Sequence, residues 1–160
     1  MNRIVSRLLP SPASNEYYGS KIALYFFGLV SVVMMGRSLV HLFKDDAGIN
    51  SIASMITFSG SPDPDLAVYL FASLWGLQQL IMAAIYLLVL WRYRSLISLM
   101  YLTLLLEWGG RLLVGGVLHP LDESFFTGTT PGAVAALPLF VILLVMFGLS
   151  MTRRQVVAGD

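Results

Sequence analysis

Four long apolar stretches constrain this chain more than any other feature of its sequence. They cover residues 22–43, 66–91, 96–118 and 133–151, and each holds between 19 and 26 residues. About 20 apolar residues in an α-helix cross the roughly 30 Å hydrocarbon core of a bilayer, at about 1.5 Å per residue. The sequence therefore predicts four transmembrane helices.

Composition argues against a soluble protein. Of the 160 residues, 57% are hydrophobic and 12% are charged, and the mean hydropathy is +0.78. A soluble domain of about 150 residues leaves roughly 30% of its unfolded-chain surface in water, so it cannot hide this much apolar side chain. The net charge of +1 does not point to nucleic acid, and the absence of cysteine excludes disulfides and thiolate chemistry. We expect an all-α integral membrane protein, a four-helix transmembrane bundle in which residues 1–160 form one domain.

Two shorter segments also carry helical signals. Residues 1–9 combine basic and apolar side chains, a pattern typical of a helix that lies on the membrane surface. In the first long loop, apolar residues between positions 49 and 56 recur at spacings of three and four. This spacing predicts a second interfacial helix.

Basic residues gather on one side of the predicted membrane. The termini and the short turn at 92–95 hold seven of them: Arg3, Arg7, Lys21, Arg92, Arg94, Arg153 and Arg154. The long loops at 44–65 and 119–132 hold Lys44 alone. Because cytoplasmic loops are enriched in Lys and Arg, we expect both termini on the cytoplasmic side of the inner membrane and both long loops outside.

Six strongly polar residues lie within the predicted spans: Arg37, His41, Gln78, Gln79, Glu107 and Arg111. An ionised side chain at a helix centre costs about 2.5 to 3.5 kcal/mol on insertion scales, so each must face the bundle interior, pair or reach the interface. Counting along the helices puts Glu107 and Gln78 near the midplane and the two arginines about one turn further out. We expect Glu107, Arg111 and one or both glutamines to form a buried polar cluster.

Glu107 and Arg111 are four residues apart on one helix face, with the acid first. One interpretation is an intrahelical ion pair, with Gln78 or Gln79 hydrogen-bonding Glu107 from the neighbouring helix. The alternative makes Glu107 a proton or cation carrier. A carboxylate held by an arginine keeps its charge, which argues against the carrier.

Arg37 has no acidic partner within the predicted spans. One interpretation is that it reaches the outer head groups or pairs with Asp45 or Asp46 in the following loop. The other is an anion or lipid head-group site, in which Arg37, His41 and Arg111 hold a carboxylate or phosphate. The apolar tail of that ligand would then lie between helices, near two deep tryptophans, Trp75 and Trp108.

Metal and cofactor sites are not indicated. His41 and His119 both lie at the outer edge of the predicted membrane, with Asp122 and Glu123 following in the loop. Their spacing matches no strong metal or haem ligand pattern, so we expect interfacial hydrogen bonding, no metal and no cofactor.

Glycines in the third span predict close helix contacts. Gly109, Gly110, Gly115 and Gly116 give this span small surfaces on more than one side. Small residues let helix backbones approach closely within a membrane. We therefore expect the third span to pack tightly against its neighbours.

Short motifs in the second and third spans resemble those of small bacterial four-span membrane families of unknown function, broadly the DoxX-like group. They are Gly76-Leu77-Gln78-Gln79-Leu80 and Gly110-Arg111-Leu112, and the resemblance covers roughly residues 66–118. Gln79 stands where an acid is more usual in that pattern. The resemblance implies a four-helix membrane fold and no reaction.

These features favour a small non-enzymatic membrane subunit. It would pack against a partner protein, in a larger complex or a homo-oligomer, or bind an anionic amphiphile or membrane lipid through the polar cluster; no catalytic residues are expected. One alternative is a membrane-embedded isomerase-like enzyme acting on an apolar small molecule, although His41 and Glu107 are expected to differ in depth by about 15 Å. The other is a small proton-coupled transporter, although the two halves of the chain do not repeat.

Overall fold

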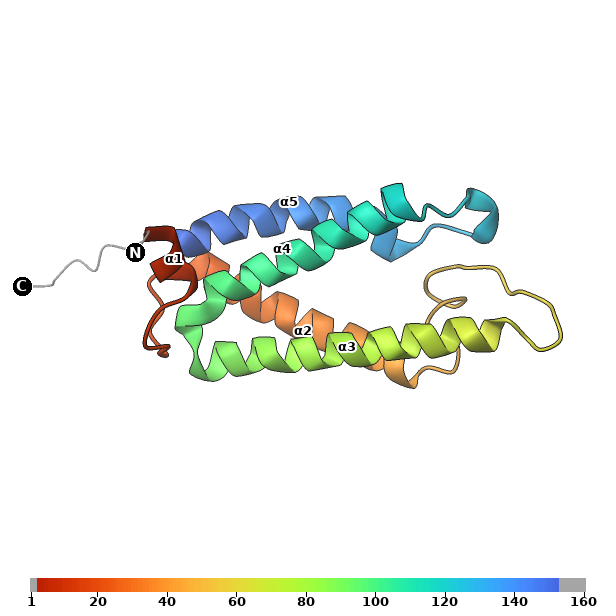
Figure 1. The fold of residues 1–160 in the computed structure, drawn as a ribbon, viewed down its shortest axis with the longest axis horizontal. Helices are drawn as coiled ribbons and strands as arrows, with labels where there is room; N and C mark the ends of the chain where they lie inside the picture. The colour runs from red at the N-terminus through yellow and green to blue at the C-terminus, as the bar shows by residue number, and fades with distance from the viewer. Residues whose placement is uncertain (1–2, 153–160) are drawn as a thin grey trace, which may run out of the picture.

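The computed structural model describes residues 3–152, and four long helices dominate it (Figure 1). They are α2 (Lys21–Phe43), α3 (Asp65–Arg92), α4 (Ile97–Leu113) and α5 (Pro131–Met151), and a short helix, α1 (Arg3–Leu8), precedes them. Within residues 3–152, four helical segments are long and apolar enough to cross a membrane. The all-helical architecture is confirmed, and the predicted spans agree with these helical segments to within two residues at each end, the third segment being Arg94–Leu118, which extends α4 in both directions.

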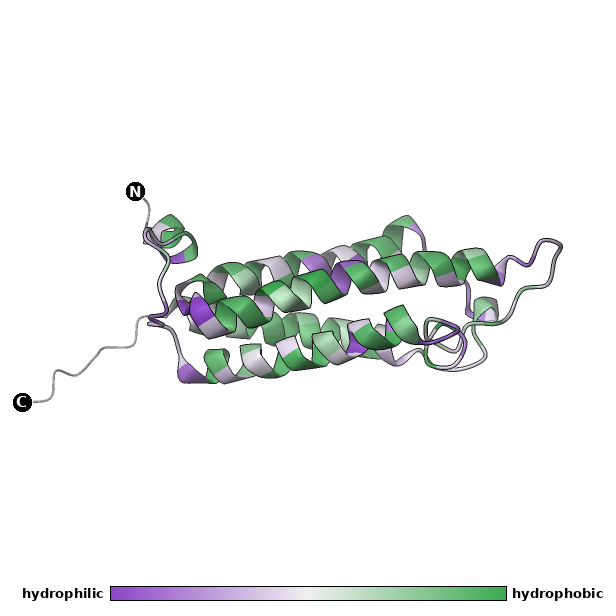
Figure 2. Cartoon of the chain, turned by 90° about the horizontal axis from the view of Figure 1, so that it is seen from below, coloured by the Kyte–Doolittle hydropathy of each residue, from purple (hydrophilic) through white to green (hydrophobic). Residues whose placement is uncertain are grey.

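Local chemistry explains several helix ends. The Ser20 side chain accepts a hydrogen bond from the backbone N–H of Ile22 and caps the start of α2. Pro131 occupies the first turn of α5, where its missing N–H costs nothing. A 3-10 turn (Arg94–Leu96) leads into α4, and one turn of π-helix (Val114–Leu118) extends it. Figure 2 shows that the long helices are mainly hydrophobic, with hydrophilic residues at their ends and at a few positions within them.

The bundle is built from two helix pairs. α2 packs along α3, and α4 packs along α5, whereas α3 and α4 make few close contacts after the turn that joins them. In Figure 1, α3 and α4 diverge from that turn toward the long loops. We call the end with α1 and this turn the terminal end, and the end with the long loops the loop end.

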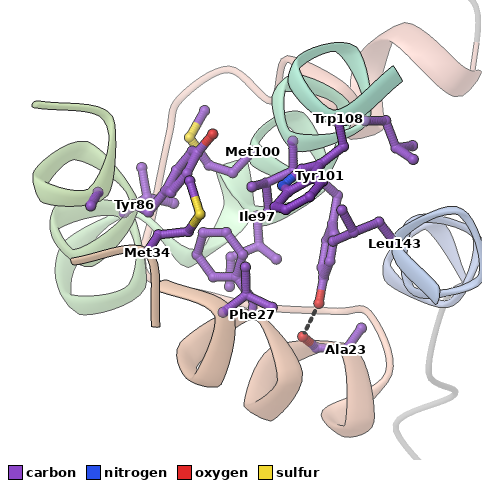
Figure 3. Close-up of a cluster of buried hydrophobic side chains, with 14 of the residues drawn as sticks. Ala23, Phe27, Met34, Tyr86, Ile97, Met100, Tyr101, Trp108 and Leu143 are labelled. Carbon is purple, nitrogen blue, oxygen red and sulfur yellow. Dashed lines mark hydrogen bonds between the residues drawn. The ribbon is translucent and has the colours of Figure 1, made fainter. Parts of the chain in front are cut away.

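An aromatic core joins the two pairs in the half of the bundle near the terminal end. Phe27 of α2 lies between Tyr86 of α3 and Tyr101 of α4, with ring centroids 5.7 and 5.5 Å away (Figure 3). The Tyr101 hydroxyl donates a 2.6 Å hydrogen bond to the carbonyl of Ala23. Leu143 brings α5 into the same core, and all four large side chains are fully buried.

Glycine contacts in α4 match the prediction at one position. A Cβ at Gly109 would lie 3.1 Å from Cε2 of Phe140 on α5, so the two helices approach closely there. At Gly110, Gly115 and Gly116 a Cβ would meet nothing within 4 Å. The expectation of close helix contact is therefore wrong for these three.

The two long loops join into one cap at the loop end. Backbone hydrogen bonds connect Ile56 to Phe125 (3.0 Å) and Thr127 to Ser54 (2.7 Å), and the Thr130 hydroxyl donates to the carbonyl of Ala53 (2.7 Å). An isolated β-bridge pairs residue 55 with residue 126. At the loop end, the two long loops are therefore hydrogen-bonded to each other through their backbones and do not extend separately from the bundle.

The expected interfacial helix at residues 49–56 is wrong, because side chains fold this segment into turns. The Asp46 carboxylate accepts hydrogen bonds from the backbone N–H groups of Gly48 (3.0 Å) and Ser51 (2.7 Å). Gly48 has a φ of 74°, and Ser54 has a φ of 57°. The Asn50 amide donates to the carbonyls of residues 55 and 56, so these backbone groups find partners outside a helix. Within the predicted segment 1–9, residues Arg3–Leu8 do form a helix, α1, and its position on a membrane surface stays a prediction.

Candidate functional site

Two arginines and two tryptophans from three helices converge in the half of the bundle near the loop end. Arg37 of α2 has its Cζ 5.0 Å from the Trp75 ring centroid and 5.7 Å from that of Trp108. Arg111 of α4 has its Cζ 4.5 and 5.1 Å from the same two rings. Each such contact is worth about 0.5 to 2 kcal/mol, depending on how far it is desolvated. We call Arg37, Trp75, Glu107, Trp108 and Arg111 the arginine–tryptophan cluster.

Helix geometry explains why these residues meet. Glu107 and Arg111 lie four residues apart in α4, and Trp108 and Arg111 lie three apart, so all three share one face. Trp75 and Gln79, four residues apart, lie on one stripe of α3, of which Gln79 is buried and Trp75 is 38% exposed. Counting along the helices puts the two arginines at similar depth, and the structure brings both against the same pair of indoles.

The cluster carries an excess of positive charge. Arg111 forms the predicted ion pair with Glu107. Within residues 3–152, Arg37 forms no ion pair with a carboxylate. Its predicted alternative partner Asp46 instead lies 3.4 Å from the Lys44 ammonium, so the pairing of Arg37 with the loop acids is wrong. Two guanidinium groups therefore share one carboxylate.

All the partners of the Asp46 carboxylate that the structure shows lie in its own loop. Partial burial alone would raise its pKa, but hydrogen bonds from Ser51 and Gly48, with the Lys44 charge nearby, hold the pKa of Asp46 well below its usual range. The aspartate is therefore ionised at neutral pH and belongs to the cap rather than to the cluster.

His41 connects the cap to the cluster. Its Nδ1 donates a 2.7 Å hydrogen bond to the carbonyl of Ala47, and its ring centroid lies 4.9 Å from that of Trp75. A Cβ at Gly76 would lie 2.7 Å from the Cβ of His41, so α2 and α3 touch at this level. The predicted head-group residue His41 is thus buried beside the cluster, with one ring nitrogen already engaged.

The two glutamines lie in different environments. Gln78 is exposed on the side of α3, whereas Gln79 is only 2% exposed and points into the bundle. Among the hydrogen bonds of residues 3–152, neither glutamine contacts Glu107, so the predicted interhelical bond is wrong. Gln78 does not belong to the buried cluster, and Gln79, one helical turn from Trp75, has no hydrogen-bond partner among the described residues.

Several buried polar atoms near the cluster have no hydrogen-bond partner among the described residues. They are both amide atoms of Gln79, Nε1 of Trp108 and Nε of Arg111; the hydroxyls of Tyr17 and Tyr86, nearer the terminal end, also have none. Each unsatisfied buried group costs about 1 to 3 kcal/mol. Native proteins retain few such groups, and those that persist often face an ordered water or a ligand. Sequence reasoning missed Tyr86, although it continues the stripe of Trp75 and Gln79 at helical spacing.

The remaining predicted polar positions lie apart from the cluster. His119, Asp122 and Glu123 are exposed in the second loop, where Asp122 accepts a 2.9 Å bond from the backbone of Ser124. No group of three His, Asp or Glu side chains in residues 3–152 could hold a metal ion. Arg153 and Arg154 lie outside the described residues.

A cavity of about 880 Å³ lies at the opposite, terminal end, beneath α1. Its walls include Arg7, Glu16, Tyr17, Ser95 and Ser98. Arg7 donates to the carbonyl of Met151, and burial raises the pKa of Tyr17 to about 12. The cavity also holds an unpartnered hydroxyl, that of Tyr17, whereas the arginine–tryptophan cluster combines unpartnered atoms with an excess of positive charge.

Comparison of the chain with protein-family models, with curated proteins and with solved structures finds no match.

Proposed function

We propose that this protein is a small, non-enzymatic membrane protein that binds the anionic head group of an amphiphile or lipid at the arginine–tryptophan cluster. The observation that carries the proposal is that Arg37 and Arg111 stack on the same two indoles while only Glu107 balances them. An uncompensated charge within a membrane is expensive. A carboxylate or phosphate would neutralise it and accept charge-assisted hydrogen bonds from the guanidinium N–H groups.

A ligand would reach this site laterally from the bilayer rather than from the water at the loop end. At the loop end, the paired loops form a cap, and His41 attaches the cap to the cluster. Trp75, in contrast, is 38% exposed on the side of the bundle. Large apolar side chains on the third helical segment, such as Leu106 and Val117, are also exposed and would face lipid. A ligand with an apolar tail is therefore favoured over a small aqueous anion.

The proposed orientation puts both termini in the cytoplasm and the cap outside the inner membrane, which places the cluster in the outer leaflet. It rests on the asymmetric distribution of basic residues in the sequence. Because the chain has no cysteine, Ser51→Cys and Arg94→Cys can each be labelled alone with a membrane-impermeant reagent in intact cells. Ser51→Cys should react and Arg94→Cys should not; the reverse pattern would invert the topology.

Native mass spectrometry of the protein purified in several mild detergents tests the binding function. The wild type should retain an anionic amphiphile, and Arg37→Gln should lose it while remaining folded, because a neutral amide is cheaper to bury than an unpaired guanidinium. Arg94→Gln, which removes a cation at the terminal end, is the matched control and should retain the ligand. A wild type that carries no anionic amphiphile in any of these detergents would remove the proposal. Co-purification of a stoichiometric protein complex without a lipid would favour the partner-binding role instead.

A further inference from the structure

Two side chains with unpartnered polar atoms lie in the cluster or one helical turn from it: Trp108, and Gln79 next to Trp75 on α3. Both are buried, since Gln79 is 2% exposed and Trp108 is 5% exposed. Among residues 3–152, neither the Gln79 amide nor the Trp108 indole N–H has a hydrogen-bond partner. The charge excess explains why an anion would bind, but it does not explain these uncharged groups.

Helix direction turns Gln79 and Trp108 toward the same level of the bundle. Side chains lean toward the N-terminus of their own helix, and α3 and α4 run in opposite directions. Gln79 therefore leans toward the loop end, and Trp108 and Arg111 lean toward it from α4. Gln79 lies four residues from Trp75, about 6 Å deeper along α3.

The arrangement therefore offers two adjacent subsites of different chemistry. The outer one has two guanidinium groups against one carboxylate, so a ligand with a single negative charge balances it. A phosphate monoester, with a charge of about −1.5 to −2, would overcompensate. The deeper one offers the amide N–H of Gln79 and the indole N–H of Trp108 to an uncharged oxygen acceptor.

We infer that the occupant is a phosphodiester lipid with ester-linked acyl chains, whose phosphate lies on Arg37 and Arg111 and whose ester carbonyl accepts from Gln79 and Trp108. A simple fatty acid carries one oxygen function and would leave the deeper subsite empty. Inorganic phosphate has no second function and no apolar tail. This inference rests on the proposed function and specifies its ligand.

A competition between two lipids that differ only in the carbonyls tests the deeper subsite. The protein in mild detergent receives an equimolar mixture of phosphatidylglycerol and its ether-linked dialkyl analogue, and native mass spectrometry measures the bound ratio. One net hydrogen bond corresponds to about 0.5 to 1.5 kcal/mol, so the ester lipid should be preferred roughly three- to tenfold. Oleate and inorganic phosphate are added separately, to distinguish a lipid phosphodiester from a carboxylate or a free anion.

Two neighbouring glutamines provide the variant and its control. Gln79→Leu removes the buried amide, so the bound ratio of ester lipid to ether lipid should fall toward one while the total amount of bound lipid persists. Gln78→Leu changes an exposed neighbour in the same helix and should keep the preference. Gln79→Met serves as a second, flexible replacement if Gln79→Leu does not fold.

The outcomes separate this inference from the proposed function. Equal binding of ester and ether lipid by the wild type, still dependent on Arg37, would overturn the inference and leave the proposed function standing. Displacement of the lipid by oleate or inorganic phosphate at equal concentration would also overturn it. Failure of every anionic amphiphile to bind would remove the proposed function and the inference together. Loss of the ester preference in Gln78→Leu as strongly as in Gln79→Leu would contradict the role assigned to the buried amide.

Discussion

The two halves of the bundle differ in the charge that they bury. Near the terminal end, the Tyr101 hydroxyl donates to the carbonyl of Ala23, and the Ser98 hydroxyl donates to that of Ser150. Polar atoms without partners among the described residues occur in both halves, at Tyr17 and Tyr86 near the terminal end and at Gln79 and Trp108 near the loop end. Near the loop end, however, two arginines lie against the same two indoles. The first half holds the aromatic core, and the second holds the site that we propose for a ligand.

The largest expected effect comes from the aromatic core. Phe27→Ala removes the ring that lies between Tyr86 and Tyr101, and truncation of a buried aromatic residue costs about 3 to 5 kcal/mol. Leu29→Ala, at a position 58% exposed on the same helix, should have little effect. Unfolding in detergent, followed by circular dichroism, measures both. Equal destabilisation by the two variants would mean that this half has no special role in the fold.

The next effect concerns the charged pair in the other half. Glu107→Gln and Arg111→Leu should each destabilise the protein by up to about 3 kcal/mol, less than a fully buried pair because both side chains retain some exposure. The double variant should cost less than the sum, since neither charge is then left alone. The loop pair of Lys44 and Asp46, whose lysine is 43% exposed, provides the comparison, with an expected coupling below about 1 kcal/mol. Strict additivity at Glu107 and Arg111 would show that the pair is not coupled.

A third effect tests the close approach of α2 and α3 beside the cluster. Gly76→Ala would put a Cβ 2.7 Å from the Cβ of His41 and 3.0 Å from the α2 backbone, so the helices must separate at a cost of about 1 to 3 kcal/mol. Gly110→Ala meets open space and should stabilise α4 by about 0.5 to 1 kcal/mol. Thermal midpoints of the two variants give the comparison. If Gly76→Ala is as stable as the wild type, the two helices do not touch as described.

The smallest effect compares two tyrosine hydroxyls in one core. Tyr101→Phe removes a hydrogen bond to Ala23 and should cost about 1 kcal/mol. Tyr86→Phe removes a buried hydroxyl without a partner among residues 3–152 and should be neutral or slightly stabilising in lipid-free protein. Denaturation of the two single variants under one set of conditions distinguishes them. A cost at Tyr86 equal to that at Tyr101 would mean that its hydroxyl is satisfied.

The fold was predictable because membrane thickness sets a physical length for each helix. The sequence also predicted the ion pair of Glu107 with Arg111, since residues four apart share a helix face. The helix predicted at residues 49–56 does not form, because hydrogen bonds between the backbone and the side chains of Asp46 and Asn50 override the apolar spacing. These bonds, like the pairing of the two loops, depend on tertiary positions that periodicity does not encode.

Part of the site was predictable because the regular rise of an α-helix fixes the depth of each residue. Counting along helices gave the similar depth of Arg37 and Arg111, but not that both stack on the same indoles. The sequence could not choose between Gln78 and Gln79, because the choice depends on the rotation of α3 about its axis. That rotation follows from the contact of Gly76 with His41, which depends on the packing of two helices.

Tryptophan fluorescence in vesicles tests the central claim most directly. The Trp91→Phe variant keeps Trp75 and Trp108 as its tryptophans and is reconstituted in phosphatidylcholine containing a low mole fraction of brominated lipid. If the cluster holds an anionic head group, brominated phosphatidylglycerol should quench far more strongly than the same fraction of brominated phosphatidylcholine. Arg37→Gln in the same background should abolish that difference. Equal quenching by the two brominated lipids, with Arg37 in place, would contradict the assignment of this cluster as an anionic lipid site.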